Sequence, residues 1–355
     1  MDRPPIEELQ ARRGLYDLLA RLYLRPPDET LLQALRELPG LAEHVAIPPD
    51  ALEALQVEYE AIFGRNVYPY ESLYRDRELM LNTAAADRIA RLYAACGFAA
   101  GLNEAGAPDH LGLELGLMAQ LVAREVAALA GEDGAARSWA RARQGQCLHE
   151  HLALWVTPCV WAIERVSTHP LYLTVARLTM ELVLDDLGRV EAPVLGSLPL
   201  EPVREAPTLP PPGPTSDREL IPLRPYPDQP EGERDQGLNR VVRQLITADE
   251  VGIFFSRSDL TLIGRQLGLP VPIGERFQML RGLFESAGQF ELIAPLIDAL
   301  DALVTTEASR VEAFVGAYPA WSAGADHWRT RLERGRALLE ELRTQMRAPL
   351  DEPTL

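Results

Sequence analysis

Apolar residues recur three or four positions apart over most of the first half of the chain. Stripes of this kind run through residues 15–23, 52–63 and 111–129, and each is long enough for several helical turns. No stretch alternates convincingly between apolar and polar positions, which is the pattern of a half-buried strand. The pattern therefore predicts an all-α fold, with a bundle of helices over residues 6–187.

The residues at the ends of these stripes predict where the helices begin and stop. Asp109 directly follows a proline and is placed to cap the N-terminus of a central helix over residues 109–130. A further helix is expected over about 135–155, with Pro158 interrupting it before a short continuation. The stripe through residues 171–182 then closes this segment.

A change of composition divides the chain. Twelve prolines fall between Pro193 and Pro230, which predicts an extended or disordered linker over residues 188–234. Helical spacing returns after it and predicts a second, smaller helical lobe over residues 235–346, followed by a disordered tail over 347–355.

Within this second lobe, Ser256 and Asp259 have the spacing of a capping box, and Gly268 is expected to end the helix that they begin. Later helices are expected over about 275–287, 290–304 and 325–346.

Charge and residue usage exclude several function classes. The chain of 355 residues has a formal net charge of −17, and all of its 35 basic residues are Arg. Without lysine, neither a Walker phosphate loop nor a Schiff-base enzyme is available. The acidic balance argues against a nucleic-acid binder, because such proteins gain affinity by neutralising phosphates. It suits a basic partner.

The N-terminus begins Met1-Asp2-Arg3-Pro4-Pro5 and shows no apolar signal core, and no apolar run approaches the roughly 18 residues that a membrane span needs. We therefore expect a cytoplasmic protein without a membrane span. The three cysteines form no CxxC pair, so a disulfide framework is not expected.

The first candidate motif is Pro69-Tyr70-Glu71-Ser72-x-Tyr74. Extended backbone around the proline is expected to present the tyrosines on the surface, where rings with polar tips suit peptide contacts. Glu71 offers a carboxylate that can accept two hydrogen bonds from a guanidinium. In the other interpretation, Glu71 or Ser72 caps the next helix and the tyrosines pack inward.

The second candidate motif is Pro108-Asp109-His110-Leu111. His110 lies one turn before Glu114, so the two side chains can share a helix face and act as a proton-transfer couple or as a polar anchor. In the other interpretation, Asp109 is only a cap, His110 bonds a nearby carbonyl and Glu114 is solvated.

The two motifs together resemble the TorD/DmsD/NarJ group of redox-enzyme maturation chaperones, over about residues 10–187. The resemblance implies a cytoplasmic chaperone, without catalysis or cofactor, that binds the twin-arginine signal peptide and immature catalytic subunit of a molybdenum oxidoreductase before export. It also implies which positions bind the peptide: Tyr70, Glu71, Ser72, Tyr74, Pro108, Asp109, His110 and Glu114. Ala107 departs from the group, since many relatives have an acid there.

Other functions stay open at this point. A helical scaffold that holds partners on two lobes is one, and a nucleotide or small-molecule binder using His110 and Glu114 is another. Cys147, His149, His151 and Cys159 lie close in sequence, but their spacing fits no compact zinc pattern, and we expect no metal. The sequence is compatible with a monomer or with a domain-swapped dimer.

Overall fold

The structure is a computed structural model that describes residues 6–38, 40–44, 51–76, 83–190, 233–246, 255, 257–271, 276–289 and 291–347. All regular elements in these ranges are helices, and their only strand-like feature is an isolated antiparallel bridge between Tyr70 and His110. The predicted all-α class is confirmed. None of the helices described is long and apolar enough to cross a membrane.

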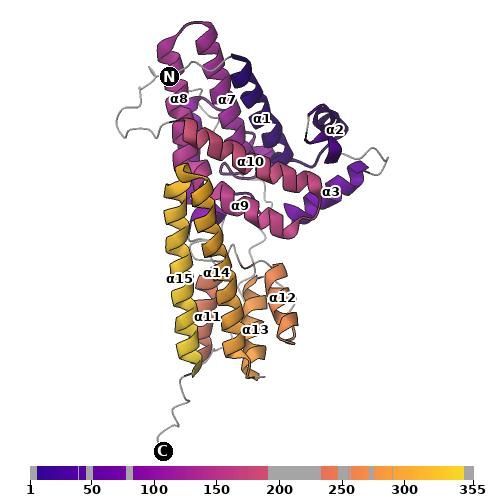
Figure 1. Cartoon of the computed structure of the whole chain (residues 1–355), viewed down its shortest axis with the longest axis vertical. Coiled ribbons are helices and arrows are strands. Elements are labelled where there is room, and N and C mark those ends of the chain that lie inside the picture. The colour runs from indigo at the N-terminus through magenta and orange to yellow at the C-terminus, as the bar shows by residue number, and fades with distance from the viewer. Residues whose placement is uncertain are drawn as a thin grey trace, which may run out of the picture.

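The N-terminal lobe, residues 6–190, is a bundle in which α1, α7 and α8 lie side by side and α9 and α10 cross below them (Figure 1). Its elements are α1 (Ile6–Leu24), α2 (Glu29–Arg36), η1 (Ala42–His44), α3 (Ala51–Ile62), α4 (Glu71–Arg75), α5 (Ala84–Cys96), α6 (Leu102–Ala105), α7 (Leu111–Ala130), α8 (Gly134–Cys147), the π-turn η2 (Leu148–Leu152), α9 (Ala153–Val166) and α10 (Pro170–Arg189).

Helix α7 is the centre of this bundle, as its apolar spacing predicted. Leu111, Leu115, Met118 and Val122 are fully buried along one side of it. The capping prediction was wrong, because the N-cap of α7 is His110, whose Nδ1 accepts from the backbone N–H of Gly112 at 3.0 Å. The carboxylate of Asp109 turns instead toward another helix.

The break after α8 also differs from the prediction. The helix is interrupted at the π-turn η2, whereas Pro158 lies inside α9, which continues to Val166. A proline in a helix interior removes the N–H that would bond the carbonyl four residues earlier, here that of Leu154. That carbonyl accepts instead from the indole Nε1–H of Trp328 at 3.0 Å, so a donor from elsewhere in the chain replaces the missing bond.

The C-terminal lobe, residues 233–347, is a second helical bundle. Its elements are α11 (Glu233–Ile246), α12 (Arg257–Gln266), α13 (Arg276–Gln289), α14 (Ile293–Ala317), η4 (Pro319–Trp321) and α15 (Ser322–Arg347). Helix α14 is much longer than the helix predicted over 290–304, because Glu307 and Val311 continue its buried side. Gly268 ends α12 as expected, with a left-handed φ of 66°.

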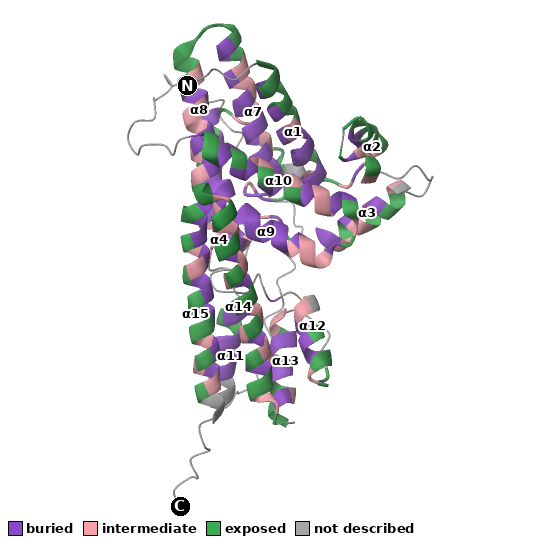
Figure 2. Ribbon diagram, viewed as in Figure 1, coloured by how far each residue is buried: buried purple, intermediate pink, exposed green. Residues whose placement is uncertain are grey.

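Helices α14 and α15 run side by side, and their connected ends lie against α9 and α10 of the N-terminal lobe (Figure 1). The indole of Trp321 donates to the carbonyl of Ala153 at 2.8 Å, and the ring of Trp161 packs against Phe314 and Trp321. Helix α9 is consequently buried on nearly all sides (Figure 2).

Some predictions concern residues outside the described ranges. These are most of the predicted linker, Ser256 of the predicted capping box, and the predicted tail after Arg347.

Candidate functional site

The two sequence motifs meet in one place, which we call the junction and define by Pro69–Tyr74 and Pro108–Glu114. The N–H of Glu71 donates to the carbonyl of Asp109 at 2.9 Å, and the N–H of Leu111 donates to the carbonyl of Pro69 at 2.8 Å. These two bonds form the bridge between Tyr70 and His110. The loop before α4 is thereby held against the loop before α7.

Aromatic side chains support the bridge. The rings of Tyr70 and His110 meet edge to face with their centroids 4.9 Å apart, and the Tyr70 hydroxyl donates to the carbonyl of Ala105 at 2.8 Å. The hydroxyl of Tyr93 donates to the carbonyl of Pro108 at 2.9 Å. The backbone of the second motif is therefore fixed from two sides.

Asp109 caps the short helix α4, although it lies in a different segment of the chain. Its Oδ2 accepts from the backbone N–H of Ser72 at 2.8 Å, in the first turn of α4. Tyr70, the N-cap by position, makes no side-chain cap bond. Burial raises the pKa of the Asp109 carboxyl, and the hydrogen bonds from Ser72 oppose that rise.

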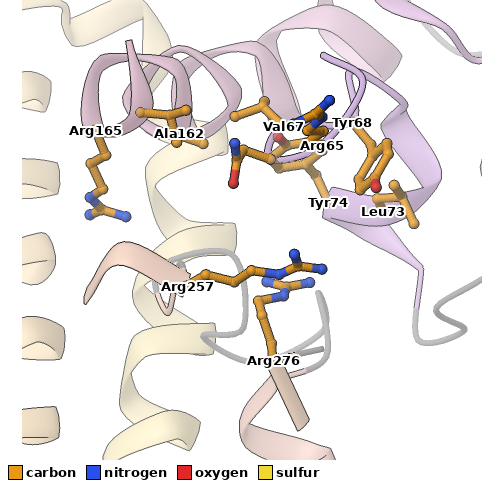
Figure 3. Close-up of a pocket in the computed structure, with 11 residues that line it drawn as sticks. Arg65, Val67, Tyr68, Leu73, Tyr74, Ala162, Arg165, Arg257 and Arg276 are labelled. Atoms are coloured by element: carbon orange, nitrogen blue, oxygen red, sulfur yellow. The ribbon is translucent and has the colours of Figure 1, made fainter. Parts of the chain in front are cut away.

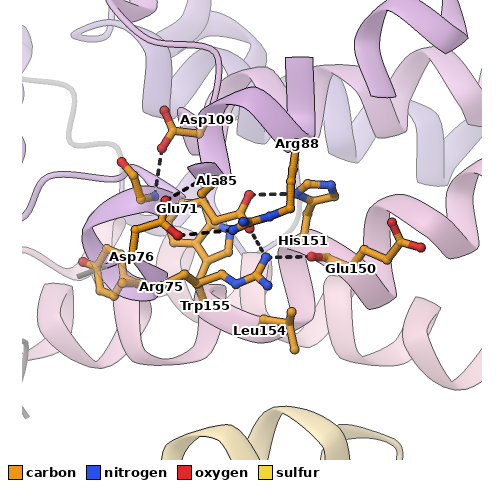
Figure 4. Close-up of polar contacts among 12 residues, drawn as sticks. Glu71, Arg75, Asp76, Ala85, Arg88, Asp109, Glu150, His151, Leu154 and Trp155 are labelled. Atoms are coloured by element: carbon orange, nitrogen blue, oxygen red, sulfur yellow. Dashed lines mark hydrogen bonds and ion pairs between the residues drawn. The ribbon is translucent and has the colours of Figure 1, made fainter. Parts of the chain in front are cut away.

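Glu71 is the most heavily bonded acid of the junction, and Figure 4 shows its partners. Its side chain forms an ion pair with Arg75 one turn later, and its Oε2 lies 2.7 Å from Nδ1 of His151 in the π-turn. Arg75 also donates to the carbonyl of Glu150 at 2.7 Å. The π-turn thus supplies His151 to Glu71 and the Glu150 carbonyl to Arg75, from a segment about 80 residues away. Such turns occur frequently at functional sites.

Glu114 completes a group of three buried carboxyls. Its Oε2 accepts from the indole N–H of Trp155 at 3.3 Å, while Oε1 is buried with no hydrogen-bond partner among the described residues. Burial, and next to it the charges of Glu71 and Asp109, raise the pKa of Glu114 well above its ordinary value. The pKa of His110 is lowered to about 4 by burial, which keeps the imidazole neutral and its Nδ1 free to accept.

Six of the eight predicted peptide-binding residues are buried. Glu71, Ser72, Asp109 and Glu114 are fully enclosed, and Tyr74 and His110 are at most 5% exposed. Tyr70 and Pro108 are the two that are partly exposed. A peptide lying on this surface would contact only Tyr70 and Pro108 directly. The six buried residues would act on it through their charges and by fixing the shape of the surface.

Sequence reasoning missed several residues of the junction. Arg75 could have been found, because it stands four residues after Glu71, the spacing of a helical ion pair. His151 and Trp155 carry no local signal, since only the fold brings the π-turn beside α4. Arg331 of α15 was also missed; its guanidinium donates to the carbonyls of Tyr74 and Arg75, the latter at 2.9 Å, and so closes the end of α4.

Across the described ranges, no group of three or more His, Cys, Asp or Glu side chains is arranged to hold a metal ion. Residues 28–160 match the model of the nitrate reductase delta subunit family, and the whole junction lies within the match. Over this segment the chain is similar to that family, whose members are chaperones for the maturation of molybdenum enzymes. No curated protein and no solved structure matches the chain.

Proposed function

We propose that this protein is a cytoplasmic chaperone that binds the immature catalytic subunit of a molybdenum oxidoreductase and its twin-arginine signal peptide. Binding would hold the subunit back from export until its cofactor is inserted. The match of residues 28–160 to the family model supports the general function. A groove on the N-terminal lobe supports the binding of the peptide.

The groove lies between α1 and α2 and is the observation that carries this proposal. Its volume is about 500 Å³ and its floor is apolar, with a charged rim. The lining residues are Ala11, Gly14, Leu15, Asp17, Leu18, Arg21, Arg25, Asp28, Thr30, Leu31, Ala34, Glu37 and Leu38. A signal peptide combines arginines with an apolar stretch, and a groove of this kind can take the apolar stretch as a helix or an extended strand.

One end of the groove lies near the junction. Arg25 lines the groove, and its neighbour Leu24 packs so closely on Gly112 that a Cβ there would come within 2.6 Å of Leu24 Cγ. Gly112 is two residues after His110. A peptide with its apolar part in the groove can therefore bring its arginines toward the junction.

The junction supplies the acidic partner for those arginines. Arg75, whose side chain is 17% exposed, already pairs with the buried Glu71. We propose that a peptide guanidinium exchanges with Arg75, because the carboxylate geometry that binds one guanidinium suits another. Tyr70 and Pro108, at the partly exposed edge, would contact the peptide backbone.

The first experiment is affinity purification of the tagged full chain from its own cytoplasm, followed by mass spectrometry. Recovery of a molybdenum-enzyme catalytic subunit with its leader uncut supports the proposal and identifies the peptide. If an unrelated assembly is recovered reproducibly and no such subunit, the proposed function is wrong.

The leader peptide of that subunit then tests the groove by fluorescence anisotropy. Gly14 faces open space, so Gly14→Leu fills the groove without a clash. Gly316 on α14 is an equally open helical glycine, and Gly316→Leu is the matched control. We expect Gly14→Leu to weaken binding at least about tenfold, the equivalent of about 1.4 kcal/mol. Equal affinities for the two variants would place the peptide elsewhere.

Arg75→Ala tests the exchange of guanidiniums. If a peptide arginine takes the place of Arg75, removal of the competitor leaves binding as tight as in the wild type or tighter, whereas Glu71→Gln weakens it. Weaker binding by Arg75→Ala, in a variant that is still folded, would contradict the exchange.

A further inference from the structure

The C-terminal lobe contacts the junction through a buried arginine of α15, Arg331. Its side chain is 3% exposed, and its guanidinium donates to the carbonyl of Tyr74 and, at 2.9 Å, to the carbonyl of Arg75. Tyr74 and Arg75 are the last two residues of α4. Carbonyls at the end of a helix have no partner within the helix, so groups outside it must bond them. Here the donor lies in the other lobe, 256 residues after Arg75.

Helix α4 depends on such bonds because it is very short. It has five residues, Glu71–Arg75, and a helix of this length is not stable on its own. Asp109 accepts from the backbone N–H of Ser72 in the first turn, and Arg331 donates to the carbonyls of the last turn. One end of α4 is thus held from within the N-terminal lobe and the other end from the C-terminal lobe.

A hollow between the lobes lies beside the same helix (Figure 3). Its volume is about 130 Å³, and its lining includes Leu73 and Tyr74 on the side of α4 and Arg257 and Arg276 on the side of the C-terminal lobe. Close packing between the lobes, of the kind found in protein interiors, therefore does not fix this side of α4. The hydrogen bonds from Arg331 hold the helix where the packing is incomplete.

The guanidinium of Arg331 is positioned by a second contact between the lobes. It lies over the ring of Trp328, 4.8 Å from the ring centroid. The indole of Trp328 in turn donates to the carbonyl of Leu154 in α9 at 3.0 Å. The docking of α15 on α9 and the bonding of α4 by Arg331 are consequently parts of one arrangement, so a shift of α15 would disturb both.

The helix held in this way carries the ion pair that is proposed to receive a peptide arginine. Glu71 and Arg75 are four residues apart, so their side chains meet while α4 stays helical. The ring of Tyr74 packs on that of Trp155 with 5.4 Å between centroids, and the indole of Trp155 donates to Glu114. A displaced end of α4 would therefore disturb two of the three buried carboxyls of the junction.

We propose that the C-terminal lobe sets the affinity of the junction for its peptide, and that Arg331 is the positioning residue through which the lobe acts. With α15 docked, Arg331 keeps α4 helical and holds Glu71 in place to accept a guanidinium. Arg331 is buried, so it acts on the peptide through α4. The inference rests on the proposed function, because the ligand is the arginine-bearing leader peptide.

The first test is hydrogen–deuterium exchange of the full chain without peptide. Arg331→Met keeps a long apolar side chain over Trp328 and removes the donors to α4. We expect the backbone N–H groups at the end of α4, such as that of Asp76, which donates to the carbonyl of Ser72 at 2.9 Å, to exchange about tenfold faster. Unchanged exchange at the end of α4 would overturn the proposal.

Arg331→Lys is the conservative variant for the same measurement. Its ammonium keeps the charge and can bond a carbonyl, but it lacks the planar fork of the guanidinium. We expect exchange at the end of α4 to be intermediate between the wild type and Arg331→Met. If Arg331→Met does not fold, Arg331→Lys decides the question, and exchange as slow as in the wild type would overturn the proposal.

Arg310 of α14 provides the matched control. It also lies over a tryptophan, 4.5 Å from the ring centroid of Trp161, and it also bonds the N-terminal lobe, through Glu164 of α9. Arg310→Met therefore removes an arginine of the same kind from between the lobes and leaves the bonds from Arg331 to α4 in place. Exchange in α4 and peptide affinity should stay as in the wild type. Equal effects of Arg310→Met and Arg331→Met would overturn the assignment to Arg331.

Fluorescence anisotropy with the leader peptide measures the effect on binding. We expect Arg331→Met to weaken binding at least about fivefold, within the usual range of coupling between sites. Glu71→Gln removes the carboxylate that α4 presents, so adding Arg331→Met to it should cause little further loss. An undiminished further loss in the Glu71→Gln background would overturn the proposal, because Arg331 would then act independently of Glu71.

The outcome of the binding measurement also separates this inference from the proposed function. If the wild-type chain does not bind the leader peptide, the proposed function is wrong and this inference fails with it. If the wild type binds and Arg331→Met binds equally well, the role of the C-terminal lobe is wrong and the proposed function stands.

Discussion

The carboxylate of Asp109 accepts a hydrogen bond from the backbone N–H of Ser72 at 2.8 Å, across 37 residues of sequence. The bond joins the two motifs that the sequence singles out, and the bridge between Tyr70 and His110 lies directly beside it. The motifs are therefore two halves of one structural unit. Their shared role in the fold explains why most of their side chains face inward.

Asp109→Ala tests how much this unit stabilises the fold. The substitution leaves a buried backbone N–H at Ser72 without an acceptor, and we expect the free energy of unfolding to fall by about 1–3 kcal/mol. Asp133→Ala is the control, because Asp133 accepts from Ala136 in the same way at an exposed helix start and should cost less. Urea unfolding measures both. Equal losses would mean that burial of the cap adds nothing.

His110 predicts a pH dependence of stability. Its pKa is about 4 in the folded protein and near 6.5 when unfolded, so the unfolded state takes up a proton first as the pH falls. The contribution of neutral His110 to the free energy of unfolding is fully present above pH 6.5. It is lost between pH 6.5 and 4 and amounts to at most about 3 kcal/mol.

The variant for this test is His110→Asn, because asparagine is a good N-cap without a titrating group. We expect the wild type to lose stability relative to His110→Asn as the pH is lowered through that window. The nearby acids Asp109 and Glu114 titrate in both proteins, so the comparison isolates the imidazole. A difference that stays constant from pH 7 to 4 would rule out a buried neutral histidine.

Glu114→Gln is expected to stabilise the protein at neutral pH. The folded-state pKa of Glu114 is raised, so the folded protein loses stability as the pH rises above about 4.5, the ordinary value. Glutamine keeps an oxygen for the indole of Trp155 and removes the charge. The unfolding free energy at pH 8 should rise by on the order of 1 kcal/mol, with no gain near pH 4. Destabilisation at pH 8 would show that the carboxylate is well solvated or paired.

Pro158 and Trp328 should be energetically coupled. Trp328→Phe leaves the carbonyl of Leu154 without a donor, at a cost of about 1–3 kcal/mol. In the double variant with Pro158→Ala, the restored N–H can bond that carbonyl, so the combined loss should be smaller than the sum by about 0.5 kcal/mol or more.

Trp321 provides the control for this cycle. Its indole donates to the carbonyl of Ala153, which lies four residues before Thr157 rather than before the proline. Trp321→Phe should therefore couple less strongly to Pro158→Ala in the same urea-unfolding measurements. Strict additivity for the Trp328 pair would mean that the proline plays no part in docking the lobes.

The fold was largely predictable because apolar spacing is a local signal. The stripes at 52–63 and 111–129 became α3 and α7 nearly as expected. The sequence-based predictions failed where a group distant in the chain replaces a hydrogen bond that the local sequence cannot make. Pro158 was expected to interrupt a helix, and it does not, because Trp328 from the other lobe bonds the carbonyl that the proline leaves unpaired.

The two motifs of the junction could be singled out from the sequence, but the burial of their side chains could not. The sequence shows that Glu71 and Asp109 stand at helix starts, yet it cannot show that Arg75 and His151 enclose Glu71 or that Asp109 caps α4.

The two carbonyls of α9 that accept from Trp321 and Trp328 have a consequence for how the protein unfolds. If the C-terminal lobe detached alone, these acceptors and the ring of Trp161 would lose their partners at the same moment. Detachment of the C-terminal lobe would therefore destabilise α9, which belongs to the N-terminal lobe. We expect a single cooperative transition in calorimetry, with the proline-rich stretch marking a boundary in the sequence and not a boundary between independently melting units.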